Sequence, residues 1–358
     1  MLSKVAKGDR TPLSGILNSA CGAVSQQKFM LGFVTLFVLM AVYLLVKPAP
    51  SIKRTSKDFQ SIRGVWLTDI GTAFLHHTTL LDNVLNHLSR SGYNRIYVNV
   101  YGNWGTLYPS RSKVRNTEIT SLFLAPPLTN PLKSVAQEGK RQGLKVYAWL
   151  EYGLMLPPNS QIAKSHPDWL LKTPEGKTVV DHFAWLDPSH PEVQNYILSM
   201  LNEIIQYDLD GIQFDDHWAI PVQFGYRQKD LTTLTQKVHQ LIQEKKPKLI
   251  FSLSPNPYAF SINRYNQDWL RWIKKGYIDE IVIQVYRKTP REVRQSINTS
   301  GVAEASRFVP VAIGIFAPWD ATEKEIKEQI KVVNELGYGF SVFCWERRFI
   351  NALLEKRI

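Results

Sequence analysis

The amino-acid sequence predicts an α/β fold, a (β/α)8 TIM barrel preceded by an N-terminal transmembrane anchor. Three observations lead to it. Short apolar runs of strand character recur along residues 61–358, amphipathic segments with helical spacing lie between them, and the runs number eight. Eight βα units in about 300 residues are typical of such a barrel, and a doubly wound sheet is the weaker alternative. The expected strands are Gly64–Ile70, Arg95–Tyr101, Lys145–Glu151, Gly211–Asp215, Leu249–Ser254, Glu280–Tyr286, Phe308–Ile315 and Phe340–Trp345.

Composition fits a globular protein with a leader. The chain has 358 residues, of which 44% are hydrophobic, and its two cysteines, Cys21 and Cys344, predict no structural disulfide. The net charge is +12, but residues 1–58 hold 8 Lys/Arg against 2 Asp/Glu. The remaining excess is not clustered, so no nucleic-acid partner is expected. No Gly-x-Gly-x-x-Gly follows the first strand, and no cofactor is expected.

The leader predicts a membrane anchor. Phe29 to Val46 is a run of 18 uncharged residues, just long enough to span a bilayer, and no small-x-small cleavage site follows it. We therefore divide the chain into a basic cytoplasmic segment (1–28), a transmembrane helix (29–46), a polar tether (47–60) and a barrel domain (61–358). Basic residues flank both ends of the span, and we predict a single-pass plasma-membrane protein with its barrel outside the cytoplasm.

The fourth expected strand ends in three titratable groups. Asp215, Asp216 and His217 follow the apolar run Gly211 to Phe214. In a barrel of parallel strands, the carboxyl ends form the active-site face. This stretch is therefore the predicted centre of the chemistry.

Alternation within the strands predicts which side chains face the barrel axis. One face of each strand must pack on the helices and be apolar, so the other face points inward. The inward set is polar and aromatic: Tyr97, Asn99, Tyr101, Tyr147, Trp149, Glu151, Gln213, Asp215, Ser252, Ser254, Gln284 and Tyr286. Asp216 has the opposite parity to Asp215. Buried polar networks can be purely structural, but carboxylates at strand ends are costly without a purpose.

Two carboxylates on neighbouring strands supply what glycosidic bond cleavage requires, an acid and a base or nucleophile. Glu151 and Asp215 are the predicted pair, with Asp216 as a further catalytic candidate. Aromatic faces near the strand ends, including Trp104 and Trp319, suit stacking on sugar rings. The candidate substrate-binding residues are Trp66, Asn99, Tyr101, Trp149, Tyr152, His182, Gln213, His217, Trp218, Asn256, Gln284, Tyr286 and Trp345.

Several motifs together resemble a known family. They are, in order, Arg63-Gly-Val-Trp-Leu-Thr68, Trp149-Leu-Glu-Tyr-Gly153, His166-Pro-Asp-Trp169, Trp185-Leu-Asp-Pro188, Asp210-Gly-Ile-Gln-Phe-Asp-Asp-His217, Ser252-Leu-Ser-Pro-Asn256 and Gln284-Val-Tyr-Arg287. With these motifs the chain looks like the family-10-like glycosyl hydrolases of bacteria, notably the cyanobacterial branch, over about Arg63 to Glu346. The resemblance implies a barrel hydrolase that is exported to the cell envelope and acts on a glycan such as peptidoglycan.

The strand-four segment is also similar in outline to the chitinase motif Asp-Gly-x-Asp-x-Asp-x-Glu. Gln213 stands where that motif has an Asp, and His217 stands where it has the acid Glu. The resemblance implies that the acid comes from Glu151 or Asp216. Asp215 and Tyr286 match the acetamide-orienting positions in kind, which leaves substrate-assisted cleavage of an N-acetylhexosamine linkage open.

Two other functions remain open. Asp215, Asp216 and His217, with His182 or His166, could bind a divalent metal in a polysaccharide deacetylase, although no tight metal-binding spacing is present and adjacent strand residues point in opposite directions. A glycan-binding barrel without turnover is the other alternative. The long segment between Leu154 and Ser189 is expected to form one wall of the cleft. Asp69, Glu346 and Asp320 are expected to serve in capping or salt bridges.

Overall fold

The computed structural model describes residues 32, 35–36, 48–78, 80–112, 118–318 and 320–346. The chain divides into two compact units, Met1–Pro48 and Ala49–Ile358. The predicted anchor, Phe29–Val46, lies outside the described residues apart from positions 32, 35 and 36. Among the described residues, none of the helices has the length and apolar character needed to cross a bilayer.

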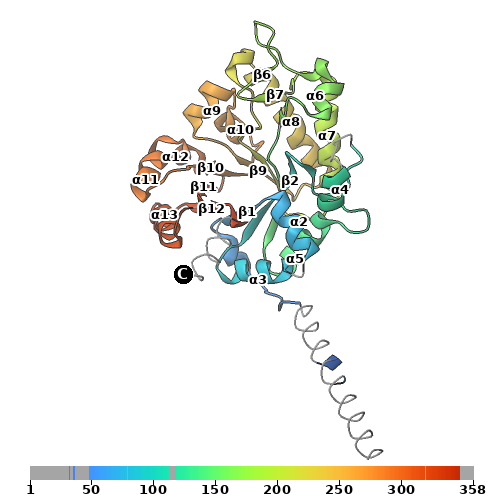
Figure 1. Cartoon of the computed structure of the whole chain (residues 1–358). Helices are drawn as coiled ribbons and strands as arrows, with labels where there is room; N and C mark the ends of the chain where they lie inside the picture. Colours follow the sequence, from blue (N-terminus) through green and yellow to red (C-terminus); the bar gives the residue numbers. More distant parts are fainter. Residues whose placement is uncertain are drawn as a thin grey trace, which may run out of the picture. The chain divides into compact units, whose positions relative to one another are not determined.

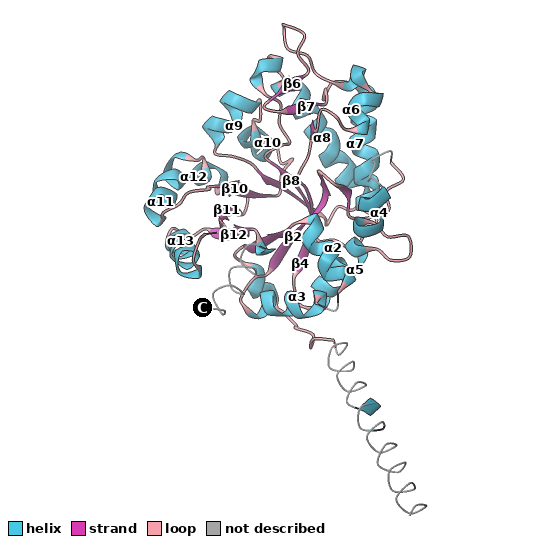
Figure 2. Cartoon of the chain, viewed as in Figure 1, coloured by secondary structure: helices cyan, strands magenta, loops and turns pink. Residues whose placement is uncertain are grey.

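The second unit is built around a closed barrel of parallel strands, as the sequence predicts. Its strands pair in the order β1, β2, β4, β8, β9, β10, β11, β12, and β12 pairs again with β1, which closes the barrel. Figure 2 shows the strands at the centre with the helices around them. The barrel strands are β1 (Arg63–Leu67), β2 (Arg95–Gly102), β4 (Lys145–Leu150), β8 (Gly211–Asp215), β9 (Ile250–Ser254), β10 (Glu280–Gln284), β11 (Val311–Phe316) and β12 (Gly339–Phe343).

The helices follow the strands around the barrel (Figure 1). Several begin with side-chain caps, such as Thr289 before α11 and Thr322 before α13, each in a capping box. The α-helices are α2 (Asp69–His77), α3 (Leu81–Arg90), α4 (Glu118–Leu124), α5 (Pro131–Arg141), α6 (Gln161–Ser165), α7 (Pro191–Ile204), α8 (Gln228–Lys245), α9 (Tyr258–Tyr265), α10 (Trp269–Lys274), α11 (Pro290–Thr299), α12 (Val302–Ala305) and α13 (Glu323–Glu335).

Six of the strands are shorter than the sequence suggests, and the first and the penultimate differ most, by three residues at one end. The first ends at Leu67 because Thr68 caps α2, so that Ile70 is helical. The penultimate strand begins only at Val311, since Phe308 and Val309 precede it in a turn after α12. In both places an apolar run continues past the strand, and the run alone does not mark where pairing stops.

The barrel interior is filled by polar and aromatic side chains in layers. In the layer at the amino ends of the strands, Arg95 forms a buried ion pair with Glu280 at 3.1 Å, and the hydroxyl of Tyr97 donates to the same carboxylate. In the layer above it, Trp66 Nε1 donates to Gln213 Oε1 at 2.8 Å. A β-carbon at Gly211 would lie 2.3 Å from the ring of Tyr147, so this position needs glycine. The interior is therefore a packed core up to its carboxyl end.

Residues 49–60, predicted as part of a tether, pack on the barrel domain. The amide of Ala49 donates to Asp82 of α3, and the Arg54 guanidinium donates to the carbonyl oxygens of Ser89 and Tyr93. A short 3-10 helix, η1 (Ser56–Phe59), precedes β1. The compact unit that contains the barrel thus begins at Ala49.

The long segment after β4 forms a small structure of its own. It contains an antiparallel sheet in the order β5 (Met155–Leu156), β7 (Phe183–Trp185), β6 (Val179–Val180), together with α6 and the 3-10 helix η2 (Pro167–Trp169). Tyr265, the last residue of α9, donates its hydroxyl to Asp181 in the β6–β7 turn. This hydrogen bond links the segment to α9, the helix that follows β9. Two elements remain: the two-residue strand β3 (Gly105–Thr106), which pairs with β2, and the 3-10 helix η3 (Val222–Phe224).

Candidate active site

Glu151 lies directly after β4, at the carboxyl end of the barrel. Asn99 on the neighbouring strand β2 donates its Nδ2 to Glu151 Oε2 at 2.6 Å. Gly102 leaves room for this pair, because a β-carbon there would lie 2.9 Å from Asn99 Nδ2 and 3.0 Å from Glu151 Oε2. Burial is the main cause that raises the pKa of Glu151; Asp69 and Asp216 add to the rise, while His217 and Asn99 oppose it. Glu151 is therefore suited to hold a proton.

Asp215 is the last residue of β8, next to β4 in the sheet. Its side chain is 7% exposed, and Gln284 of β10 donates Nε2 to Asp215 Oδ1 at 2.5 Å. Burial raises the pKa of Asp215 well above its ordinary value, and the charges of Asp216 and Glu151 raise it further. The predicted pair therefore belongs to one electrostatic cluster at the barrel mouth.

Asp216 and His217 complete this cluster. Asn256 donates Nδ2 to Asp216 Oδ2 at 2.7 Å, and His217 Nδ1 lies 3.7 Å from Asp216 Oδ1. The same ring nitrogen is 3.1 Å from the carbonyl oxygen of Glu151. The inference that Asp216 points away from Asp215 was wrong. The strand ends at Asp215, so the alternation of side chains does not continue into the following turn.

Asp215, Asp216 and His217 each offer one ligand atom within 4.8 Å of the others, which is close enough to share a metal ion. Among the described residues, this group includes neither of the histidines that the metal hypothesis would add. His166 stacks on Trp169 with ring centroids 3.9 Å apart, and His182 is exposed in the β6–β7 turn with φ of 70°. The arrangement is compatible with a weak three-residue site and is not a closed coordination shell.

Two further buried carboxyl groups lie at strand ends near this cluster. Asp69 is 5% exposed, and its Oδ2 has no hydrogen-bond partner among the described residues. Glu346 accepts from the amide and hydroxyl of Thr68 at 2.7 and 2.9 Å. Burial raises the pKa of both carboxyl groups. We had expected capping or ion-pair roles for them. Glu346 binds the N-cap of α2, and Asp69 accepts from the amide of Ile70 in the first turn of the same helix. The charge of Asp69 also contributes to the raised pKa of Glu151.

Two other predicted ligand-binding residues, Tyr152 and Trp149, interact with residues of the cluster. Tyr152 makes edge contacts with His217 and with Phe183 of the β5–β7–β6 sheet, with ring centroids 6.4 and 6.1 Å apart. Tyr286 is half-buried and packs with Phe316 and Phe343. Trp149 lies inside the barrel, and its indole opposes the rise in the pKa of Asp215.

Other predicted binding residues lie away from the mouth. Trp66 and Gln213 are completely or almost completely buried inside the barrel, where they bond to each other. Tyr101, predicted to face the axis, points outward because a register shift lies between Asn99 and Tyr101; its hydroxyl is 3.3 Å from that of Tyr196 on α7. These positions depend on contacts between segments distant in the sequence, which no local sequence pattern predicts.

Trp218 and Trp345 are also core residues. Trp218 is fully buried, stacks on Phe214 with centroids 4.1 Å apart, and donates Nε1 to Thr235 of α8. Trp345 packs in the same core between barrel and helices. Trp104, by contrast, is 52% exposed in the β2–β3 turn, and Trp319 lies outside the described residues.

The chain is similar to known proteins over most of its barrel domain. The chain matches the glycosyl hydrolase-like 10 family over residues 61–237 and 226–335. Glycosyl hydrolase DigH of Escherichia coli K12 is 25% identical over 301 residues, which cover 65% of this chain and 67% of that protein. Glycosyl hydrolase YngK of Bacillus subtilis 168 is 21% identical over 309 residues, covering 71% of this chain and 59% of that protein.

Solved structures resemble the fold. An alpha-galactosidase from Thermus thermophilus gives a TM-score of 0.52 at 12% identity, over 82% of this chain and 59% of that one. The alpha-galactosidase from Lactobacillus brevis gives 0.53 at 14% identity, over 84% of this chain and 41% of that one. The chain thus spans about half the length of these enzymes, and at such identities the likeness concerns the fold.

The barrel, the carboxyl cluster at its mouth and these relatives define a glycoside hydrolase. The chain belongs to the glycosyl hydrolase-like 10 family, whose match extends over most of the barrel domain.

Proposed function

We propose that this glycoside hydrolase cleaves the glycan strands of a cell-envelope polysaccharide, namely peptidoglycan, with Glu151 as the proton donor. One observation carries the proposal: Glu151, a buried acid with a raised pKa, belongs to one cluster with Asp215, at the end of the adjacent strand, and Asp216, directly after it. Glycosidases need one carboxyl group protonated and another able to act as base, nucleophile or charge stabiliser, and environments that differ make this division possible.

Glu151 is the better donor because its carboxyl group is held by a single neutral amide. Asn99 fixes Oε2 and leaves Oε1 available to carry the proton toward a leaving oxygen. The neighbouring carboxyl groups favour retention of this proton. The donor must be protonated in the free enzyme, and we therefore expect activity to fall as the pH rises through the pKa of Glu151.

Asp215 and Asp216 act as a coupled pair. Burial and the charge of Asp216 raise the pKa of Asp215 well above its ordinary value, so Asp215 holds its proton more readily than an exposed carboxyl group does. Asp216 is the more exposed of the two, and Asn256 orients its side chain. Asp216 is thus proposed as the base, nucleophile or charge stabiliser, and Asp215 as the residue that positions it or a substrate group.

An N-acetyl group of the substrate offers a second route within the same site. Asp215 and Tyr286 are the residues we propose to orient an acetamide for attack on the anomeric carbon. A thiazoline mimic of the cyclised intermediate should then inhibit competitively, since it resembles the transition state. If it fails to inhibit well above the substrate KM, the direct route through Asp216 is the better account.

The test of the proposal uses the full chain in detergent. Purified glycan strands, with and without stem peptides, are incubated with the protein, and the products are identified by mass. Hydrolysis takes up one water for each bond cleaved, so we expect soluble saccharides whose summed masses exceed that of the parent strand by one water per cleavage. The exposed Glu244 of α8 supplies a matched control, because Glu244→Gln changes the same functional group far from the mouth. If intact strands remain with the wild type, this substrate assignment is wrong.

We also propose that Phe29–Val46 anchors the enzyme in the plasma membrane with the barrel outside. The length of the uncharged run supports this placement. A topology reporter fused after Ile358 should be active only outside the cytoplasm. A reporter that is active only inside would reverse the proposed orientation.

Metal-dependent deacetylation is the second candidate, because Asp215, Asp216 and His217 converge within 4.8 Å. It predicts release of acetate without chain cleavage, and loss of activity with a chelator that Zn²⁺ restores. Cleavage that is unaffected by the chelator would exclude this function.

A further inference from the structure

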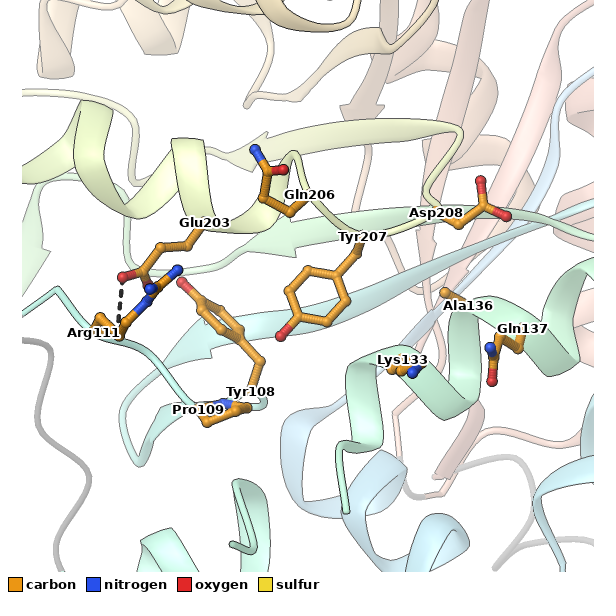
Figure 3. A pocket seen from close by; sticks show the side chains of 10 residues that line it. All are labelled: Tyr108, Pro109, Arg111, Lys133, Ala136, Gln137, Glu203, Gln206, Tyr207 and Asp208. Atoms are coloured by element: carbon orange, nitrogen blue, oxygen red, sulfur yellow. Dashed lines mark hydrogen bonds between the residues drawn. The ribbon is translucent and has the colours of Figure 1, made fainter. Parts of the chain in front are cut away.

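A pocket of about 370 Å³ lies on the flank of the barrel, away from the carboxyl cluster. Its walls are α5, the end of α7 with the turn that follows, and the segment from Tyr108 to Arg111 (Figure 3). It shares none of its lining residues with the mouth. The volume is at the lower end of the range for small-ligand sites, which is about 300 to 1,000 Å³.

The acidic side chains of this pocket are already occupied. Glu203 accepts from Ser110 Oγ at 2.6 Å, from the amides of Arg111 and Ser112 at 2.8 and 2.7 Å, and from Ser112 Oγ at 3.1 Å. Asp208 is paired with Lys140, and this hydrogen bond lowers the pKa of Asp208. Neither carboxylate therefore needs a ligand to satisfy it.

The basic side chains, in contrast, are not paired. Within the described residues, neither Arg111 nor Lys133 takes part in an ion pair, and both are exposed. Lys246 lies next to the pocket, because its Nζ donates to the carbonyl oxygen of Tyr207 at 2.7 Å. The lining itself holds two carboxylates that are already bonded and two basic side chains, Arg111 and Lys133, that form no ion pair within the described residues and can bind a carboxylate or another anion.

The remaining lining suits a hydroxylated ring. Tyr207 is half-buried, with its hydroxyl held by Asn130 Nδ2 at 2.8 Å and its ring packed edgewise on Tyr108 at 5.8 Å between centroids. These contacts fix the ring of Tyr207, which lines the pocket and offers apolar surface of the kind that contacts sugar rings. The side chains of Gln137 and Gln206 add neutral amide donors and acceptors. Figure 3 shows Tyr207 between the α5 side chains and Tyr108.

We propose that this pocket is a second saccharide site, which binds a sugar residue carrying a carboxylate. Arg111 and Lys133 would bind the carboxylate, and Tyr207 would lie against the ring. The inference rests on the proposed function in one respect, namely that the sugar belongs to the same polymer that the barrel mouth cleaves. Such a site would hold the polymer on the enzyme between cleavage events and so increase its effective concentration.

The test compares two sugars that differ in one group. N-acetylmuramic acid has a lactyl carboxylate, and N-acetylglucosamine has none. Each is titrated by ligand-observed NMR into the full chain in detergent, with Glu151→Gln as the background so that no turnover occurs. N-acetylmuramic acid should bind at least about tenfold more tightly, since charge-assisted hydrogen bonds are the stronger ones.

Variants locate the site. Lys133→Gln and Arg111→Gln should each weaken N-acetylmuramic acid by about tenfold and leave N-acetylglucosamine unchanged. Lys229→Gln, which removes an exposed charge at the start of α8, is the control and should bind as the background does.

Three results would overturn the inference: equal binding by Lys133→Gln and Lys229→Gln, equal affinity for the two sugars, or competition by inorganic phosphate at the concentration at which the acid sugar binds. The last would identify a general anion site. Since no result depends on turnover, the saccharide site can stand if glycan cleavage fails, and the reverse also holds.

Discussion

The exchange Glu151→Gln is the most direct test of the proposed donor. The side chain keeps its size, and the new amide oxygen can still accept the 2.6 Å hydrogen bond from Asn99. The variant loses the transferable proton and little else. A positioned general acid contributes about 10²- to 10⁴-fold. We therefore expect kcat to fall by that factor, which corresponds to about 3 to 5 kcal/mol of transition-state stabilisation.

The same exchange makes a prediction about stability. Burial raises the pKa of Glu151 in the folded protein above that of the unfolded chain. Its contribution to stability is then complete below the unfolded pKa and is lost as the pH rises through the folded pKa. Gln has no proton to lose. The variant should therefore gain stability relative to the wild type as the pH rises through this window.

The assays are initial rates on glycan strands and urea unfolding followed by tryptophan fluorescence, each from pH 4 to pH 9. Glu244→Gln is the control for both. A leaving group that needs no protonation, such as a dinitrophenolate, should restore much of the rate of Glu151→Gln. If Asp216→Asn is rescued in this way and Glu151→Gln is not, the donor is Asp216 and the roles must be exchanged.

Three other substitutions test the packing around the site. Gly102→Ala places a β-carbon 3.0 Å from Glu151 Oε2 and should lower kcat about tenfold or more; an unchanged kcat would show that the pair can move freely. Trp218→Ala should cost about 3 to 5 kcal/mol in urea unfolding with KM unchanged, because the side chain is core; a raised KM would mean ligand contact. Arg95→Met should cost about 3 to 5 kcal/mol by leaving Glu280 charged and buried, and Arg95→Met/Glu280→Leu should recover most of it; no recovery would contradict the pairing.

The barrel could be predicted from the sequence because its strands are short, buried and separated by amphipathic helices. Side-chain alternation also gave correct inward positions within the strands, as for Asn99 and Gln213. It failed where the strand geometry changes. Tyr101 follows a register shift and Asp216 follows the strand end, so the period of two no longer applies to either.

The aromatic residues could not be assigned from local sequence. Trp218 comes three residues after Asp215, close enough in the chain to suggest a role at the mouth. Its backbone turns back instead, with the Trp218 amide donating to the Asp215 carbonyl at 3.0 Å, and its indole stacks beneath α8 on Phe214. The direction of this turn depends on a helix that begins ten residues later, which no pattern around Asp215 reveals.

The contribution of Asp69 to the pKa of Glu151 was not predicted, because it depends on barrel closure. Asp69 follows β1, the first strand, and Glu346 follows β12, the last; the sequence separates them by almost the whole domain, but β1 and β12 are paired. Glu346 binds the Thr68 amide and hydroxyl and so holds the start of α2, where Asp69 is buried. From there the charge of Asp69 helps to raise the pKa of Glu151. Burial is the main cause of the raised pKa of Glu151, and Asp69 adds to it from a position that the pairing of the first and last strands creates. The sequence around Asp215 could identify the carboxyl groups but not this contribution, because it comes from the other end of the domain.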